Sequence, residues 1–240
     1  MPAQKPTVVL IHGAFAESAS WSGVIEQLQG SSVNVIAVAN PLRSLSGDAA
    51  YVRDVIAAID GPVVLVGHSY GGMVITEAAA GNSQVIGLVY VCAFAPDHGE
   101  TALGLSGKFP GSTLGQALFT YPVSSGGNES TIRSDAFHHQ FAADAAPAQA
   151  AVMAATQRPA TENALSSGLS TNAPAWKNVP SWFVFSDQDL NIPVAAHRFM
   201  ADRAGAKGVR EVPGGSHALS VSQPGAVTAT IVEALHAVSA

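Results

Sequence analysis

Short, almost wholly apolar runs alternate with segments of helical periodicity along the first part of the chain. The apolar runs cover residues 7–12, 33–39, 63–66 and 86–91. Between them, residues 21–28 can form a short helix, and from Asp48 onward apolar residues recur at helical spacing. Apolar runs without polar alternation are typical of strands buried on both faces of a parallel sheet. The pattern therefore predicts an α/β, doubly wound sheet whose strands are joined by right-handed crossovers.

This rhythm breaks after Cys92. From about residue 96 to residue 180 the chain is rich in Gly, Ser, Ala and Pro and shows no second strong strand pattern. We predict loop at residues 104–127 and helix at residues 131–153 and 161–167. The segment is too long for a plain connection and too polar to form a sheet of its own. It therefore predicts a helical cap inserted after the fourth strand.

The strand and helix pattern resumes after the cap. It predicts strands at residues 181–186 and 208–212, a helix at residues 194–204, and a last helix with Val227, Ile231 and Leu235 on one face. We therefore expect a single domain over residues 1–240, with a mostly parallel sheet of about six strands. Its core covers residues 1–95 and 180–240, and its cap covers residues 96–179, approximately.

Composition narrows the classes of partner. The chain has 240 residues, of which 48% are hydrophobic and 12% charged, and this low charge density indicates a compact fold rather than disorder. A net charge of −6 disfavours nucleic acid and anionic membranes, since both attract basic surfaces. No apolar stretch reaches membrane-spanning length, and the chain leads from Met1 almost directly into a strand, leaving no room for a signal peptide. We expect a soluble, cytoplasmic protein, and a homodimer is compatible with the sequence.

The cysteine and histidine content indicates neither a disulfide nor a bound metal. Cys92 is the only cysteine and lies in an apolar run, so it has no disulfide partner and is expected to be a buried, inert thiol. His138 and His139 are adjacent and follow Asp135, but one such pair without further ligands is weak support for a metal. We expect no cofactor and no metal.

Ser69 lies in the run Gly67-His68-Ser69-Tyr70-Gly71, directly after the apolar strand at residue 63 and before a small-residue helix. A serine on such a tight strand-to-helix turn has its Oγ exposed above the sheet edge, and only glycine fits two residues to either side. A plain helix N-cap is the alternative interpretation of Ser69. The flanking strand and helix favour a nucleophile.

Three further loops follow the carboxyl ends of predicted strands, where function gathers in such a sheet. They are residues 12–15, 186–189 and 213–217. A serine needs an imidazole to accept its proton and a carboxylate to hold that imidazole. His217 supplies the imidazole, whereas the spacing alone leaves Asp187 and Asp189 both open. The other histidines are interpreted as surface or packing residues, with turn hydrogen bonding for His12 and His68.

These four runs together resemble the α/β-hydrolase superfamily, most closely the small capped branch that contains plant methylesterases and hydroxynitrile lyases. The resemblance spans essentially the whole chain. It implies Ser69 as nucleophile, His217 as general base and acid, and Asp189 as orienting carboxylate, because Pro193 fixes the spacing of that loop. It also implies an oxyanion hole made by the backbone N–H groups of Ala14 and Tyr70. The residues expected to line the substrate pocket are Gly13, Phe15, Trp21 and Phe94.

The branch contains both hydrolases and lyases, and two positions favour hydrolysis. The cyanohydrin-cleaving relatives place a threonine and a lysine where this chain has Gly13 and Ala218, so cyanide departure has no cation to assist it. Absence of Gly-x-Gly-x-x-Gly in the first turn argues against nucleotide binding. We therefore expect a carboxylesterase-like serine hydrolase that cleaves small, mostly apolar esters or lactones through an acyl-enzyme. A hydroxynitrile-type lyase and a low-turnover small-molecule receptor are the alternatives.

Overall fold

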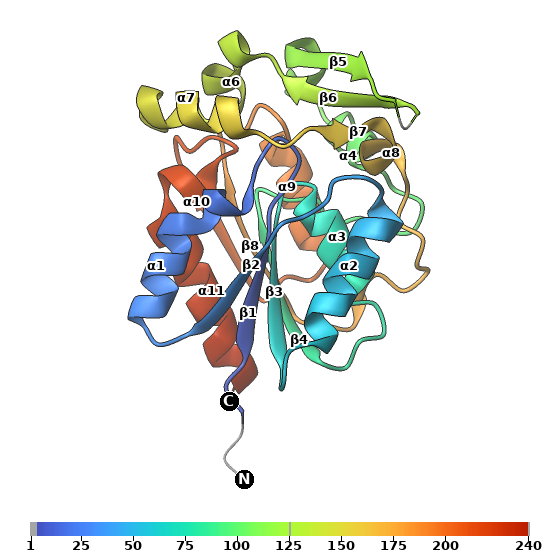
Figure 1. Cartoon of the computed structure of the whole chain (residues 1–240). Coiled ribbons are helices and arrows are strands. Elements are labelled where there is room, and N and C mark those ends of the chain that lie inside the picture. The colour runs from blue at the N-terminus through green and yellow to red at the C-terminus, as the bar shows by residue number, and fades with distance from the viewer. Residues whose placement is uncertain (1–3, 125, 240) are drawn as a thin grey trace.

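The computed structural model describes residues 4–124 and 126–239 and is built around one six-stranded sheet in which all strands are parallel (Figure 1). The strand order is β2-β1-β3-β4-β8-β9. In chain order the strands are β1 (Thr7–Ile11), β2 (Asn34–Val38), β3 (Val63–His68), β4 (Val85–Val91), β8 (Ser181–Ser186) and β9 (Gly208–Val212). The predicted α/β fold with a mostly parallel sheet of about six strands is confirmed.

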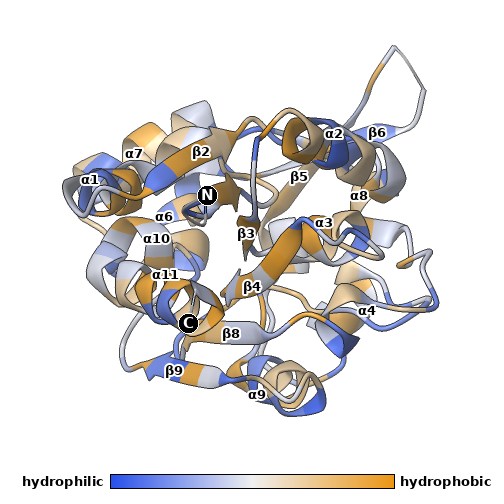
Figure 2. Cartoon of the chain, turned by 90° about the horizontal axis from the view of Figure 1, so that it is seen from below, coloured by the Kyte–Doolittle hydropathy of each residue, from blue (hydrophilic) through white to orange (hydrophobic). Residues whose placement is uncertain are grey.

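The burial of each strand follows its place in the sheet. Strands β1, β3 and β8 are buried along their whole length, whereas the edge strands β2 and β9 are partly exposed. Figure 2 shows the central strands as hydrophobic segments between two layers of helix. The uninterrupted apolar runs of the sequence are thus those that are covered on both faces.

Helices cover both faces of the sheet (Figures 1 and 2). One face carries α1 (Ser22–Gly30) and α11 (Pro224–Ser239), and the other carries α2 (Leu45–Ala57), α3 (Gly71–Ala78) and α9 (Val194–Arg203). The short elements η1 (Ser18–Trp21) and α10 (Leu219–Ser222) lie on the side of α1. Helix α2 begins before the predicted Asp48, because the Ser44 hydroxyl accepts a hydrogen bond from the Gly47 N–H at 3.1 Å and caps the helix.

The segment between β4 and β8, residues 96–179, is called the cap below. It lies above the end of the sheet at which the strands finish (Figure 1). Its helices are α4 (Ala102–Ser106), α5 (Leu114–Ala117), α6 (Ser134–Phe141), α7 (Pro147–Thr156), α8 (Glu162–Ser166) and η2 (Ala175–Lys177). Its strands are β5 (Leu118–Pro122), β6 (Asn128–Ile132) and β7 (Ala160–Thr161).

The cap contains a second sheet, and the prediction that this segment is too polar to form one is wrong. Strands β5, β6 and β7 form a three-stranded antiparallel sheet. Strand β6 is polar, whereas β5 is mostly apolar and aromatic but stays partly exposed, so neither strand has the pattern of a buried apolar run. Gly126 and Gly127, both with positive φ, make the turn between them. In place of the one helix predicted at residues 131–153, the structure has two, α6 and α7, and α7 begins at Pro147.

Among the described residues, no helix combines the length and the apolar character needed to cross a bilayer. The expectation that no signal peptide precedes the first strand concerns residues 1–3, which lie outside the described residues.

Candidate active site

Ser69 occupies the turn between β3 and α3 with a backbone φ of 53°. This left-handed conformation is rare for a residue other than glycine and is costly unless the surroundings enforce it. Two backbone hydrogen bonds do so, from Ser69 N–H to the Val91 carbonyl at 3.2 Å and from Gly72 N–H to the Ser69 carbonyl at 3.0 Å. The turn therefore holds the serine side chain at the end of the sheet, where it lines a pocket beneath the cap.

Glycine is required on both sides of this turn because backbones approach closely there. A Cβ on Gly67 would lie 2.6 Å from the Gly71 carbonyl oxygen, and a Cβ on Gly71 would collide with the Ile11 carbonyl. Gly13, on the neighbouring loop, is equally confined, since its Cβ would lie 2.6 Å from the Ser69 Cβ. The loop after β1 thus rests directly against the serine.

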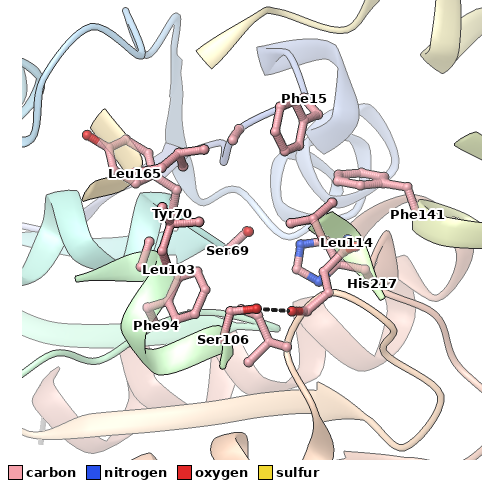
Figure 3. A pocket seen from close by; sticks show the side chains of 14 residues that line it. Phe15, Ser69, Tyr70, Phe94, Leu103, Ser106, Leu114, Phe141, Leu165 and His217 are labelled. Atoms are coloured by element: carbon pink, nitrogen blue, oxygen red, sulfur yellow. Dashed lines mark hydrogen bonds between the residues drawn. The ribbon is translucent and has the colours of Figure 1, made fainter. Parts of the chain in front are cut away.

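His217 and Asp189 form a buried hydrogen-bonded pair. The His217 Nδ1–H donates to Asp189 Oδ2 at 2.7 Å, and the two side chains are 1% and 0% exposed. His217 follows β9 and Asp189 follows β8, so two neighbouring strands deliver them to the same end of the sheet. With Nδ1 engaged, Nε2 is the ring nitrogen that remains for the pocket. Figure 3 shows the Ser69 side chain pointing toward the His217 ring.

Four donors surround the Asp189 carboxylate. Besides His217, the backbone N–H groups of Asn191 and Ile192 donate to Oδ1 at 2.8 and 2.9 Å, and His197 Nε2 lies 3.1 Å from Oδ2. Burial by itself raises the pKa of the Asp189 carboxyl, but the charge of His217 and the hydrogen bonds from both imidazoles outweigh it and hold that pKa below its ordinary value. Asp189 is therefore an anion aimed at His217.

Asp187, the other aspartate of this loop, has a different contact. Its Oδ1 accepts a hydrogen bond from the Gly214 N–H at 2.7 Å and is not directed at His217. This bond joins the loop after β8 to the loop after β9. Asp187 therefore stabilises the segment that carries His217 through its backbone and does not contact the imidazole.

His12 fixes the orientation of the peptide between Gly13 and Ala14. The Asn40 N–H donates to His12 Nε2 at 3.0 Å, so the proton is on Nδ1 and is donated to the Gly13 carbonyl at 2.9 Å. In a trans peptide the N–H of Ala14 points away from that carbonyl. Within the described part of the chain, neither the Ala14 N–H nor the Tyr70 N–H has a protein acceptor. Two buried donors thus remain unused beside Ser69.

His68 is hydrogen-bonded to the backbone of the loop that carries His217. Its Nε2–H donates to the His217 carbonyl at 3.0 Å, and the two rings lie 4.8 Å apart between centroids. Burial, followed by the nearby charge of His217, lowers the pKa of His68 to about 3. His68 is therefore a neutral hydrogen-bond donor, in agreement with the turn-bonding role predicted from the sequence.

Among the described residues, Cys92, Asp189 and His197 are the group whose potential metal-ligand atoms converge, within 4.8 Å of one another. Asp189 is already engaged by its four donors, and burial raises the pKa of the Cys92 thiol, which keeps it protonated. A metal binds the deprotonated thiolate and a free carboxylate. The chemistry of this group therefore fits hydrogen bonding to Asp189 better than metal binding.

A family model described as "Alpha/beta hydrolase family" matches residues 8–230, nearly the whole chain. The chain belongs to the alpha/beta hydrolase family. A serine nucleophile and a catalytic triad are standard in this family.

Two curated proteins are similar to this hydrolase in sequence. Alpha/beta hydrolase nvfD of Aspergillus novofumigatus (strain IBT 16806) is 27% identical over 221 residues, which are 82% of this chain and 83% of that protein. The carbendazim hydrolyzing esterase of Nocardioides sp. (strain SG-4G) is 46% identical over 63 residues, which are 24% of this chain and 26% of that protein.

Solved structures show the same fold. Polyneuridine aldehyde esterase superposes with a TM-score of 0.81 at 20% identity, covering 96% of this chain and 99% of that one. A methylesterase from Arabidopsis superposes with a TM-score of 0.80 at 16% identity, with the same coverage. The predicted resemblance to the branch with plant methylesterases is confirmed.

The pocket of this hydrolase lies between the ends of the strands and the cap (Figure 3). Ser69 and His217 reach it from the core, and its walls are mostly apolar. The lining residues are Ala14, Phe15, Ser69, Tyr70, Phe94, Ala102, Leu103, Ser106, Leu114, Phe141, Leu165, Asn191, Ile192 and His217. Of the described residues, no Lys, Arg, Asp or Glu contributes to this lining. The pocket therefore suits an uncharged ligand.

Two residues expected in the pocket lie elsewhere. Trp21 is fully buried with its ring edge-on to His68, 6.3 Å between centroids, because η1 turns it toward the core. Gly13 lies behind Ser69 and has no side chain to contribute. Phe15 and Phe94 do line the pocket. Three leucines of the cap, Leu103, Leu114 and Leu165, line the pocket without having been predicted. His197, interpreted from the sequence as a surface or packing residue, is fully buried against Asp189.

Proposed function

We propose that this protein is a serine hydrolase that cleaves small, mostly apolar and uncharged carboxylic esters or lactones through an acyl-enzyme on Ser69. The observation that carries the proposal is the buried Asp189–His217 hydrogen bond, with Ser69 and His217 facing one apolar pocket. Esterase relatives support the reaction class: the Nocardioides relative hydrolyses carbendazim according to its name.

In the first half-reaction, His217 Nε2 takes the Ser69 proton while Oγ attacks the carbonyl carbon of the ester. Asp189 holds the imidazole in the tautomer with a free Nε2 and stabilises the imidazolium that forms. Negative charge develops on the carbonyl oxygen, where the Ala14 and Tyr70 N–H groups donate hydrogen bonds. The tetrahedral intermediate then expels the alcohol, which leaves with the proton from His217.

In the second half-reaction, water replaces the alcohol. His217 Nε2 takes a proton from the water, whose oxygen attacks the acyl carbon, and the same N–H groups stabilise the second oxyanion. Collapse breaks the bond to Ser69 Oγ, returns the proton to the serine and releases the carboxylic acid. The donors and the base serve both halves without rearrangement.

The surroundings of Gly13 and Ala218 support hydrolysis over the lyase alternative. A threonine at position 13 would bring its Cβ to 2.6 Å from the Ser69 Cβ and would displace the serine. Ala218 is buried and uncharged, so no cation follows His217 to stabilise a cyanide leaving group.

The test is Ser69→Ala, assayed with p-nitrophenyl acetate. We expect kcat to fall by about 10⁴-fold or more, because alanine has no hydroxyl that can attack the ester. The fold should be retained, because alanine removes only that hydroxyl. Ser166→Ala, which removes an exposed hydroxyl in α8, is the matched control and should retain wild-type activity. A fluorophosphonate should add once, at Ser69. An active Ser69→Ala protein, or wild-type release of only one equivalent of p-nitrophenol, would contradict the proposal.

A further inference from the structure

The pocket at Ser69 is too small for most esters. Its cavity volume is about 30 Å³, which corresponds to roughly two water-sized spheres. The carbonyl group of a substrate could occupy that space, but not an extended acyl chain or an aromatic ring. The larger end of the ester must therefore lie outside this pocket.

A second, larger cavity lies next to it, between the loop that follows β1 and helix α7 of the cap. Its volume is about 310 Å³. The first loop and η1 form one wall, and α7 forms the opposite wall. The lining residues are Phe15, Ala16, Glu17, Ala19, Ser20, Ser22, Gln149, Val152, Met153, Thr156, Gln157 and Val221.

Phe15 is the one described residue that lines both cavities. In Figure 3 it lies on the opposite side of the catalytic pocket from Phe94 and Leu103. Its side chain is buried, and its φ of 61° is unusual for an aromatic residue. The Phe15 N–H donates to the Arg158 carbonyl at 3.2 Å, which ties this strained residue to the chain just after α7. Phe15 therefore borders both spaces, and its side chain is the one best placed to limit passage between them.

The lining of the second cavity indicates what it would bind. Ala16, Ala19, Met153 and Val221 supply apolar surface, and the polar groups are uncharged hydroxyls and amides except for Glu17. That carboxylate is paired with Arg158, Nε to Oε1 at 2.9 Å, so it is not available to neutralise a ligand cation. An uncharged aliphatic or aromatic group is the matching ligand.

We propose that the second cavity binds the larger, apolar end of the ester and that Phe15 determines how far that end can extend. The proposal rests on the proposed function of Ser69, because the ester carbonyl must lie at Ser69 for its remainder to pass Phe15. Either the acyl group or the alcohol can be the larger end, and both supply the same apolar chemistry.

The first experiment removes the Phe15 side chain. For p-nitrophenyl esters from acetate to octanoate, Phe15→Ala should raise the ratio of kcat/KM for octanoate to that for acetate by about tenfold, since each buried methylene is favourable. Acetate esters of ethanol, hexanol and benzyl alcohol form the second arm and show whether the alcohol takes the site instead. Phe119→Ala is the matched control, because Phe119 is an exposed cap aromatic that lines neither cavity.

The second experiment fills the cavity. Met153→Trp should lower the same ratio about tenfold in the wild-type background, and it should cancel the gain in the Phe15→Ala background. Phe15→Leu replaces Phe15→Ala if the alanine variant fails a thermal unfolding test. A ratio that neither position changes, in both ester series, would overturn the proposal. If the Ser69 function itself were wrong, Ser69→Ala would retain wild-type hydrolysis, so the two failures are distinguishable.

Discussion

His197 and His217 bind the same oxygen of Asp189, at 3.1 and 2.7 Å respectively. His197 lies on the buried face of α9, and its ring stacks on Phe185 at 5.0 Å between centroids. Within the described residues the buried His197 Nδ1 has no partner, whereas Nε2 faces a carboxylate oxygen that can only accept, so Nε2 carries a proton and donates it to Asp189. His197 thereby orients the aspartate that orients His217.

We therefore expect His197→Leu to lower kcat by about tenfold to a hundredfold without abolishing folding. With one donor fewer, the Asp189 carboxylate is held less firmly against His217, so kcat should fall while KM for the same ester stays near the wild-type value. His197→Gln, whose amide can donate to the same oxygen, should restore kcat. A leucine variant with wild-type kcat, or a glutamine variant as slow as the leucine variant, would show that His197 only fills space.

The two aspartates of the loop after β8 should differ sharply. Asp189→Asn is expected to cost about 10³- to 10⁴-fold in kcat, because an amide donating to Nδ1 imposes the wrong tautomer on His217. Asp187→Asn should cost less than about tenfold, since its side-chain oxygen can still accept from the Gly214 N–H. Steady-state kinetics of both variants on one ester test this, and the reverse order would exclude Asp189 as the orienting residue.

Gly13 should tolerate no side chain. In Gly13→Ala the new Cβ would lie 2.6 Å from the Ser69 Cβ and 2.8 Å from the His68 carbonyl, so Ser69 or the loop after β1 must shift. We expect a loss of about a hundredfold in kcat, comparable to removing one oxyanion donor. Gly225→Ala is the control, because its Cβ meets open space in α11. Wild-type kinetics in Gly13→Ala would show that the contact relaxes freely.

His68 should make the fold sensitive to acid. Its pKa is about 3 in the folded protein against 6.5 for the ordinary group, so between these values the unfolded chain binds the extra proton. The free energy of unfolding therefore falls as the pH drops from 6.5 toward 3, by about 1.4 kcal/mol per pH unit from this residue. Burial lowers the pKa of His12 as well and adds to the effect.

Urea unfolding at several pH values between 7 and 4 measures this slope. His68→Gln should show a shallower loss of stability than the wild type, whereas the exposed His139→Gln should match the wild type. Equal slopes in all three proteins would mean that His68 becomes charged without unfolding.

The sequence predicts the strands of the parallel sheet well, both the fully buried β8 and the partly exposed edge strand β9. The predicted bounds of β8 and β9 agree with the structure, because the surrounding turn residues limit each run. The β5–β6 hairpin is not predicted, because β6 is polar and β5, although rich in apolar and aromatic residues, is too exposed and too short to stand out; only Gly126 and Gly127 mark its turn. The alternation of strands and helices thus predicts the strands of the parallel sheet, edge strands included, and overlooks the antiparallel hairpin of the cap, which lies outside that alternation.

The candidate site was predictable only as far as its loops could be assigned to strand ends. The contact between His197 and Asp189 crosses from a helix to a loop, and no spacing rule in the sequence encodes it. The sequence nevertheless contains an indication of this contact. His197 lies on the buried face of α9, together with Ala196, Met200 and Ala201. A histidine in such a position requires a buried partner.

The pairing of β4 with β8 joins residues about 90 positions apart in the chain, because the cap lies between them. Ser69 and Gly13 belong to the half of the sheet before this junction, and Asp189 and His217 to the half after it. Closing so long a loop costs more chain entropy than pairing β3 with β4, whose partners Val64 and Gly87 lie about 23 positions apart. We therefore expect a refolding chain to form the turn at Ser69 before His217 reaches it, so that esterase activity returns only after β4 and β8 have paired.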